Sequence, residues 1–177
     1  QGGPKRSLPL RKRQEVQVLP RPVGGPPDFG IPMRWRNIPI PEANLVSVTL
    51  GVVLHLLLPW SIFEKPWIGH AAGWPILALG IFIAGWAVSA VRQVDVEEPD
   101  RLVTSGPYAL SRNPMYLAWA MIQLGITLVV NSLWPGVFLA GAILYTHFFV
   151  IRREEYSLRE KFGEEYEKYK NEVRRYL

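Results

Sequence analysis

The sequence has no cysteine among its 177 residues. Without thiols there is no disulfide framework, zinc–thiolate site, iron–sulfur cluster or thiol nucleophile to propose. The sequence also lacks the Gly-x-Gly-x-x-Gly pattern that binds dinucleotides at the start of a Rossmann fold. We therefore expect a site without metal and without a soluble nucleotide-binding domain.

Acidic residues are fewer than basic ones, which gives a formal net charge of +5. The Lys and Arg residues flank apolar segments and do not form a patch interleaved with aromatic residues. This placement is typical of membrane proteins and argues against nucleic acid as a partner. Membrane lipids are the expected surroundings, and no feature of the sequence indicates an obligate protein partner.

Charge is missing from four long apolar stretches, at 45–63, 71–91, 116–130 and 133–151. A helix needs about 20 residues to cross about 30 Å of hydrocarbon, and the third stretch approaches this length if its helix begins at Pro114. A soluble helical bundle is the alternative, but its helices would show polar faces that these segments lack. The sequence predicts an all-α fold with four transmembrane helices, at about 45–63, 71–91, 114–132 and 133–151.

Small residues are spaced four apart on the second predicted span. Gly80 and Ala84 form one such pair, and Gly85 and Ser89 form another. Pairs of this kind let two membrane helices approach closely. We expect both pairs to lie at helix contacts.

The segments outside the spans differ from one another in composition. Residues 1–42 are rich in Pro, Gly and Arg and are expected to form a partly disordered cytoplasmic arm, with 33–39 able to lie at a headgroup surface. Residues 43–177 form the membrane domain. Its C-terminal segment, 152–175, repeats apolar residues at steps of three or four and predicts an amphipathic cytoplasmic helix, interrupted at Gly163.

The basic residues are divided unequally between the two faces of this four-span arrangement. Of the 20 Lys and Arg residues, eight precede the first span, three lie in the second loop and eight follow the fourth span, while Lys65 is alone in the first loop. Cytoplasmic segments of membrane proteins collect Lys and Arg. We therefore expect both termini and the second loop on the cytoplasmic side.

The connection between the third and fourth spans, 131–135, is too short for anything but a tight antiparallel hairpin. The hairpin brings the start of the third span beside the end of the fourth. Two polar segments, 101–116 and 152–169, are then expected to meet at the cytoplasmic face. In particular, Glu154 and Glu155 should lie close to Arg112.

The residues of these two segments form a pattern. Gly106-Pro107-Tyr108 is followed by Arg112-Asn113-Pro114-Met115-Tyr116, and after the hairpin come Glu154-Glu155, Leu158, Phe162-Gly163, Tyr166 and Tyr169. Over about residues 70–177 the chain resembles the isoprenylcysteine carboxyl methyltransferase and phospholipid methyltransferase superfamily. The resemblance implies methyl transfer from S-adenosyl-L-methionine to a lipid-like or hydrophobic acceptor at the cytoplasmic membrane interface.

The resemblance also implies roles for individual residues. Asparagine at 113 stands where many relatives carry histidine, and because it cannot titrate near neutral pH it cannot serve there in proton transfer. The catalytic candidates are Arg112, Arg153 and Glu154. The candidates for binding the methyl donor are Pro107, Tyr108, Asn113, Pro114, Tyr116, His147, Glu154 and Glu155.

Two other functions remain open at this stage. Membrane sterol reductases, which use NADPH, have a similar C-terminal architecture, but they look larger than this chain. A small transporter or assembly protein is the non-enzymatic alternative, and the lack of charge inside the predicted spans argues against it.

The orientation can be tested with labels on the expected loops. Because 19 of the 20 basic residues fall on one side of the four-span arrangement, labels near Lys65 and Trp134 should be accessible from the face opposite a reporter fused after Leu177. Accessibility to a membrane-impermeant reagent measures this. Finding Trp134 and Leu177 on the same face would show that the four-span arrangement is wrong.

Overall fold

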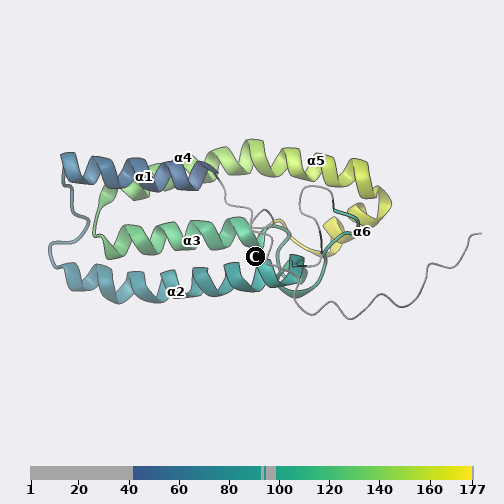
Figure 1. Ribbon diagram of the computed structural model, residues 1–177, viewed down its shortest axis with the longest axis horizontal. Coiled ribbons are helices and arrows are strands. Elements are labelled where there is room, and N and C mark those ends of the chain that lie inside the picture. The colour runs from purple at the N-terminus through teal and green to yellow at the C-terminus, as the bar shows by residue number, and fades with distance from the viewer. Residues whose placement is uncertain (1–41, 93, 95–98, 177) are drawn as a thin grey trace, which may run out of the picture. The chain divides into compact units, whose positions relative to one another are not determined.

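The computed structural model describes residues 42–92, 94 and 99–176, and these are helical wherever they have regular structure (Figure 1). The predicted all-α fold is confirmed. The predicted arm, including its 33–39 segment, lies outside the described residues except for Glu42. The elements are α1 (Glu42–Leu57), α2 (Pro66–Val91), η2 (Gly106–Ala109), α3 (Pro114–Val129), α4 (Leu133–Tyr145), η3 (Thr146–Val150), α5 (Ile151–Phe162) and α6 (Glu164–Glu172).

Two helical runs are long and apolar enough to cross a membrane. They are Pro66–Val91, which is α2, and Leu133–Phe162, which joins α4, η3 and α5 without a break. The other two predicted spans correspond to α1 and α3, apolar helices of 16 residues each. Sixteen residues extend only about 24 Å, short of the ~30 Å hydrocarbon core. Helix length therefore supports two spans and does not confirm the predicted four.

The first predicted span ends earlier than expected, at Leu57. Pro59 follows closely, and the residue before a proline disfavours the helical conformation. The chain that leaves α1 is held by Asn131, whose side chain accepts the Phe63 N–H at 2.8 Å and donates to the Phe63 carbonyl at 2.8 Å. Helix α2 then begins at Pro66, where proline suits a first turn, and not near residue 71.

Helices α2 and α3 run side by side, with α3 between α2 and the pair of α1 and α4 (Figure 1). Their backbones are close because glycines face the contact. A Cβ atom at Gly80 would lie 2.9 Å from the backbone nitrogen of Ile122, and one at Gly125 would lie 2.7 Å from that of Leu77. The predicted packing role is confirmed for Gly80. It is wrong for Gly85, whose Cβ would meet nothing within 4 Å.

Helix α1 is joined to the other helices by buried polar side chains. The Asn44 side chain donates to Gln123 Oε1 at 3.1 Å, and Gln123 Nε2 donates to the Pro135 carbonyl at 3.1 Å and to the Ser47 hydroxyl. Hydrogen bonds of this kind link helices in surroundings where polar groups find few other partners. They fix the start of α1 against α3 and α4.

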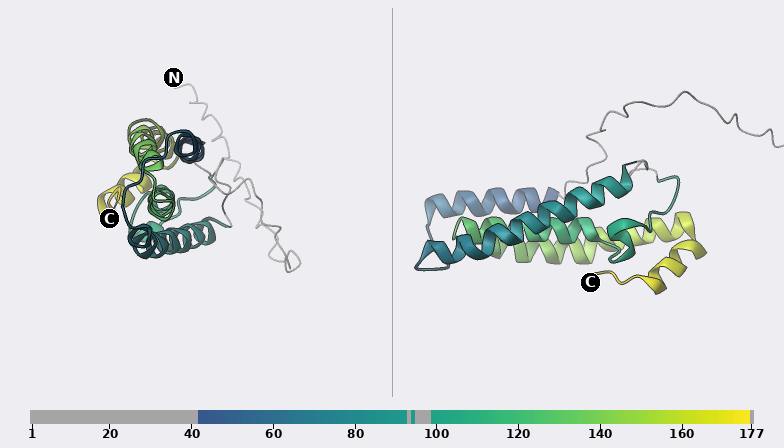
Figure 2. Two further views of the ribbon diagram at one scale, coloured as in Figure 1. Left: turned by 90° about the vertical axis from the view of Figure 1, so that its left-hand side faces the viewer. Right: turned by 90° about the horizontal axis from the view of Figure 1, so that it is seen from below.

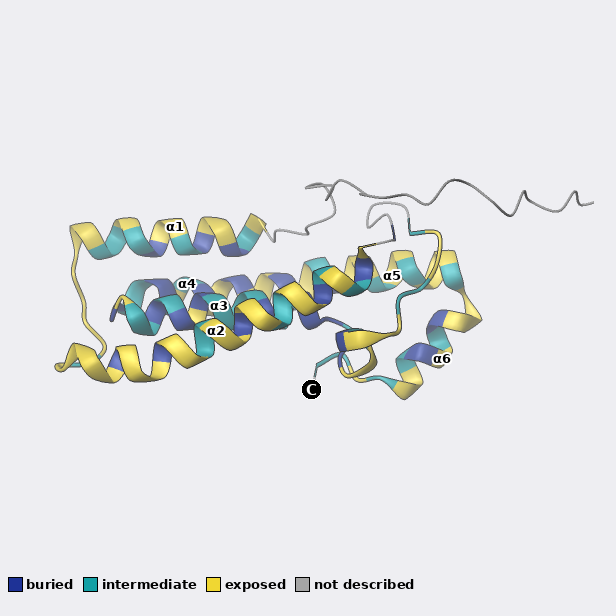
Figure 3. Cartoon of the chain, turned by 60° about the horizontal axis from the view of Figure 1, so that its bottom comes forward, coloured by how far each residue is buried: buried dark blue, intermediate teal, exposed yellow. Residues whose placement is uncertain are grey.

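The outward faces of the helices are apolar. Leu56, Phe82 and Phe149 are 77%, 65% and 66% exposed, and Figure 3 shows exposed residues along the outer faces of α1 and α2. A soluble bundle would present polar side chains there. The soluble alternative is therefore disfavoured, and a bilayer is the solvent that suits this surface.

We expect Gly125→Leu to separate α2 from α3, because its side chain would collide with the α2 backbone at Leu77. Overpacking of this kind destabilises by about 1–3 kcal/mol. Thermal unfolding in detergent, followed by circular dichroism, measures the loss. Gly85→Leu is the matched control and should unfold like the unaltered chain; equal stability of the two variants would contradict the close α2–α3 contact.

Candidate active site

The loop before α3 forms a tight turn around Pro107. Gly106 has a φ of +63°, in the left-handed region that glycine tolerates, and lies against Trp86 and Ala90 of α2. Pro107 is buried, and its carbonyl accepts the N–H groups of Leu110 and Ser111, each at 3.1 Å. The turn thereby fixes the position from which Tyr108 projects.

Two predicted donor-binding residues meet at the bundle end. The hydroxyl of Tyr116 donates to Glu154 Oε2 at 3.0 Å, across 38 residues of sequence. Tyr108 lies near the same carboxylate: burial first, and then the charge of Glu154, raise the pKa of its phenol above the usual value. Tyr108 therefore stays neutral at physiological pH. The expected contact between the loop and the acidic pair, Glu154 and Glu155, is confirmed.

Glu155 lies between two arginines. Arg112 Nη1 is 3.2 Å from Glu155 Oε1, while Arg175 binds both carboxylate oxygens, through Nε at 2.9 Å and Nη2 at 2.6 Å. Hydrogen bonding to Glu155 raises the pKa of Arg175. Arg112 Nη1 also donates to the hydroxyl of Tyr166 at 3.1 Å. The predicted proximity of Arg112 to Glu154 and Glu155 is thus confirmed, and this group of residues ties the loop before α3, α5 and α6 together.

Helix α6 is attached to the loop by Tyr169. Its hydroxyl donates to the Tyr108 carbonyl at 2.7 Å, and burial raises its pKa to about 12. Gly163, with a φ of +51°, separates α5 from α6, as the sequence predicts. The change of direction there lets α6 return toward the loop.

The segment after α6, Val173–Tyr176, which we call the clasp segment, leads back from α6 (Figure 2) and is hydrogen-bonded to the loop. The Arg112 N–H donates to the Arg174 carbonyl at 3.0 Å. The Arg175 carbonyl accepts hydrogen bonds from Ser111 Oγ at 3.1 Å and Asn113 Nδ2 at 3.2 Å. Asn113, predicted to bind the donor, therefore uses its amide to hold the clasp segment.

His147 lies in η3, a π-helical stretch of five residues. Its Nδ1 is 2.9 Å from the hydroxyl of Tyr176, and the two rings stack at a centroid distance of 5.8 Å. Such π-helical insertions are frequent at functional sites. The predicted residue His147 thus reaches the candidate site through the clasp segment.

Two other predicted residues have less direct positions. Pro114 is buried as the first residue of α3, where it serves the helix start. Arg153 is exposed and takes no part in the contacts described above. Its neighbour Arg152 lies over the Phe148 ring at 5.3 Å.

An apolar cavity of about 140 Å³ lies between α1, α3 and α4 beside this site. Tyr116 lines it, so one phenol borders the cavity and binds the carboxylate of Glu154. Thr146 also lines it, and its buried Oγ1 has no hydrogen-bond partner among the described residues. The complete lining is Asn44, Tyr116, Leu117, Ala120, Ile143, Thr146 and Tyr176.

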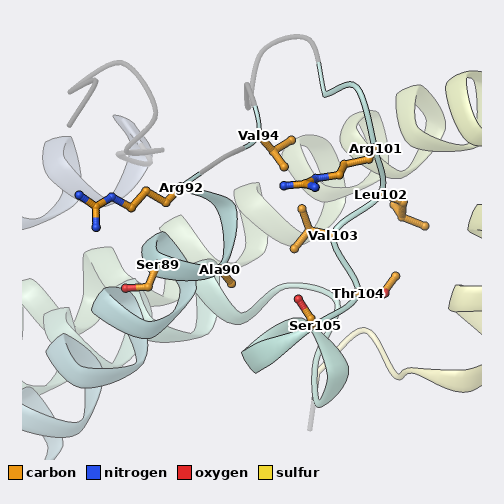
Figure 4. A pocket seen from close by; sticks show the side chains of 9 residues that line it. All are labelled: Ser89, Ala90, Arg92, Val94, Arg101, Leu102, Val103, Thr104 and Ser105. Atoms are coloured by element: carbon orange, nitrogen blue, oxygen red, sulfur yellow. The ribbon is translucent and has the colours of Figure 1, made fainter. Parts of the chain in front are cut away.

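A second, more polar cavity of about 500 Å³ lies where α2 meets the loop. Figure 4 shows Arg101 extending into it between Val94 and Val103, while Arg92 points the other way. It adjoins the Pro107 turn at Ser105, but none of the predicted site residues lines it.

Sequence reasoning missed Thr146, Arg175 and Tyr176. Arg175 counted only as one of the basic residues that indicate orientation, and Thr146 lies within a predicted span. Only the return of the chain beyond Gly163 brings Tyr176 to the cavity, and no pattern in the sequence specifies that path.

The chain belongs to the phospholipid methyltransferase family, whose family model matches residues 68–165. The match covers the α2–α3–α4 bundle, the loop and the acidic pair. It places the chain among methyltransferases and favours this class over the reductase and transporter alternatives.

Several curated proteins are similar to the chain. The human protein-S-isoprenylcysteine O-methyltransferase is 37% identical over 95 residues, which are 52% of this chain and 33% of that protein. A probable protein-S-isoprenylcysteine O-methyltransferase from Oryza sativa subsp. indica is 31% identical over 100 residues, 55% of this chain and 51% of that protein. An uncharacterized protein of Haemophilus influenzae is 49% identical over 65 residues, 36% of this chain and all of that protein.

The chain thus spans between a third and about half of the length of the named methyltransferases described above. No solved structure matches the chain significantly.

We expect Glu155→Gln to destabilise the bundle end, because it leaves the mostly buried guanidinium of Arg112 without its ion pair. Breaking such a pair costs about 3 kcal/mol. Chemical unfolding in detergent measures the change.

Glu167→Gln is the matched control. It breaks the Arg159–Glu167 pair, which is solvent-exposed, and should leave the unfolding midpoint nearly unchanged. Equal midpoints for both variants would contradict the structural role assigned to Glu155.

Proposed function

We propose that the protein transfers a methyl group from S-adenosyl-L-methionine to a lipid-like or hydrophobic acceptor at the cytoplasmic membrane interface. The observation that carries the proposal is the position of Tyr116. Its ring lines the apolar cavity, and its hydroxyl binds the carboxylate of Glu154. A single side chain therefore joins an apolar binding space to a polar, acidic one.

The residues around Glu154 fit the methyl donor. The donor carries a sulfonium cation, an amino group and ribose hydroxyls; when bound, it supplies an electrophilic methyl group. The carboxyl group of Glu154, next to two neutral tyrosines, offers hydrogen-bond acceptors for the amino group and ribose hydroxyls, and the tyrosine faces attract a cation. Arg112 Nε is buried with no hydrogen-bond partner among the described residues, so a donor remains there for an anionic group.

The predicted donor-binding residues contribute unequally to this proposal. Asn113 and Glu155 are engaged by the clasp segment, so we assign the direct contacts with the donor to Tyr108, Tyr116 and Glu154. Tyr108 and Tyr116 would donate or accept hydrogen bonds through neutral phenols, and Glu154 would accept them. Pro107 and Pro114 fix the loop that carries them.

The reaction needs alignment more than acid–base chemistry by the protein. Holding two reactants in position contributes as much as ~7–11 kcal/mol to lowering a barrier. The apolar cavity offers a mostly apolar surface to the acceptor, and the hydrogen bond from Tyr116 orients Glu154. Asn113 does not titrate, which is compatible with a reaction in which the protein aligns the reactants and does not transfer protons.

The proposed acceptor is a lipid or a lipid-modified group. The names of the relatives specify isoprenylcysteine, and the name of the family specifies phospholipid. The apolar exterior and the apolar cavity support entry from the bilayer. We further propose that the loop, the acidic pair and both termini face the cytoplasm, where the water-soluble donor is found, and that Arg153 at the membrane boundary contacts the acceptor's polar end.

The proposal is tested by calorimetric binding of S-adenosylhomocysteine to the detergent-solubilised chain. Glu154→Gln and Tyr116→Phe should each weaken binding about tenfold or more, because the first removes an acceptor for the amino group and ribose hydroxyls that this ligand keeps, and the second removes the hydrogen bond that holds Glu154. Asn113→Ala should weaken it less, through the loop. Each variant must first show unaltered circular dichroism.

Two comparisons make this test decisive. Arg101→Gln alters the polar cavity beside Ser105 and should leave the affinity for S-adenosylhomocysteine unchanged. If only Arg101→Gln lowered this affinity, the donor site would lie in the polar cavity instead. NADPH should not bind the unaltered chain. Binding of NADPH in place of S-adenosylhomocysteine would refute the methyltransferase proposal.

A further inference from the structure

We propose that Tyr176 determines which acceptors fit, by forming the end wall of the apolar cavity beside Tyr116. The cavity would take the apolar segment of the acceptor next to its reacting group, and Tyr176 would limit how bulky that segment can be. This inference rests on the proposed function and deepens it, because it concerns the acceptor side of the same site.

The walls of the cavity differ in kind. Leu117 and Ala120 belong to α3, and Ile143 belongs to α4, so their positions are set by helices packed along their length. Tyr176 comes from the clasp segment, which lies outside the helices and begins at Val173, where the backbone is extended. A side chain on such a segment can change the size of the cavity without disturbing a helix.

Tyr176 is nevertheless held firmly in place. Its ring stacks on His147 and its hydroxyl lies 2.9 Å from His147 Nδ1. The two preceding residues are bound to the loop and to Glu155 through their carbonyl oxygens and the Arg175 guanidinium. The wall is therefore rigid enough to discriminate by shape.

Thr146 provides a separate indication that the cavity receives a ligand. The residue lines the cavity, and its buried hydroxyl has no hydrogen-bond partner among the described residues. A buried polar atom without a partner is unfavourable. An acceptor with one hydrogen-bonding atom beside an apolar segment would satisfy it.

The cavity is too small for a whole lipid. Pockets that enclose drug-sized ligands measure roughly 300–1,000 Å³, whereas this one has about 140 Å³. Only a short part of an acceptor fits inside, so the size of the groups next to the reacting atom determines whether the acceptor can bind. Tyr176 would therefore distinguish branched from unbranched chains.

The test compares two thioethers with chains of the same length, N-acetyl-S-farnesylcysteine, which is branched, and N-acetyl-S-dodecylcysteine, which is not. Binding to the full chain in lipid nanodiscs is measured by native mass spectrometry, and methyl transfer is measured separately. Tyr176→Ala should raise the ratio of the affinity for the branched thioether to that for the unbranched one about tenfold. A factor of this size is within the range by which a hydrophobic pocket discriminates ligands that differ by small apolar groups. Tyr176→Phe, which keeps the ring, should leave the ratio within twofold of the unaltered chain.

Two further variants complete the design. Ala120→Leu fills the cavity from α3 and should shift the ratio in the opposite direction, so the inference is testable even if Tyr176→Ala fails to fold. Tyr156→Ala removes an exposed tyrosine and is the matched control, with no expected change. Affinity for S-adenosylhomocysteine should stay within twofold in all of these variants.

The outcomes separate the inference from the function on which it rests. A ratio that responds to Tyr176→Ala and Ala120→Leu supports the acceptor cavity even if no methyl transfer is detected, in which case the proposed reaction fails. Methyl transfer with a ratio that neither variant changes overturns the inference alone. Failure of the unaltered chain to bind either thioether overturns it as well.

Discussion

The arrangement of the candidate site depends on one carboxylate, that of Glu155. It accepts hydrogen bonds from Arg175 and pairs with Arg112, so it joins α5 to the loop before α3 and to the clasp segment. Removing such charges from water is costly unless each is paired, and here two cations share one anion with several hydrogen bonds. Because Tyr166 and Asn113 are attached to the same group, the loop, α6 and the clasp segment form one connected unit.

The second constraint is the solvent. The helices α1 to α4 present apolar side chains outward, while the loop, α5 and α6 carry most of the charged residues of the described part of the chain. A water-soluble methyl donor and an apolar acceptor meet only where these two environments adjoin. In the structure this boundary runs through Tyr116, whose ring contacts the apolar cavity and whose hydroxyl contacts Glu154.

The sequence predicted the features that depend on local pattern. Helix type, the hairpin at 131–135 and the approach of Glu154 and Glu155 to the loop follow from apolar runs and a short connection. Helix ends were less predictable, because Pro59 stops α1 before the apolar run ends and Pro66 starts α2 ahead of it. The role of Gly85 was misjudged because spacing alone does not reveal which face of a helix meets a neighbour.

The parts of the site that escaped prediction are tertiary. Asn113 and Glu155 were expected to contact a ligand, and both hold the clasp segment, whose path depends on the positive φ of Gly163 and on Tyr169. Thr146 begins η3 and Tyr176 lies in the clasp segment after α6, and the two residues meet at the cavity. No periodicity connects them.

The π-helical stretch η3 has a consequence for the register of the helical run from Leu133 to Phe162. A π turn accommodates one residue more than an α turn, and each residue of an α-helix advances about 100° around the axis. The insertion at Thr146–Val150 therefore rotates everything beyond it relative to α4. Without it, an uninterrupted α-helix would turn the acidic pair by about a quarter of a circle, away from Tyr116 and Arg112. One additional residue, placed ahead of Glu154, thus aligns an apolar helix with the polar groups of the candidate site.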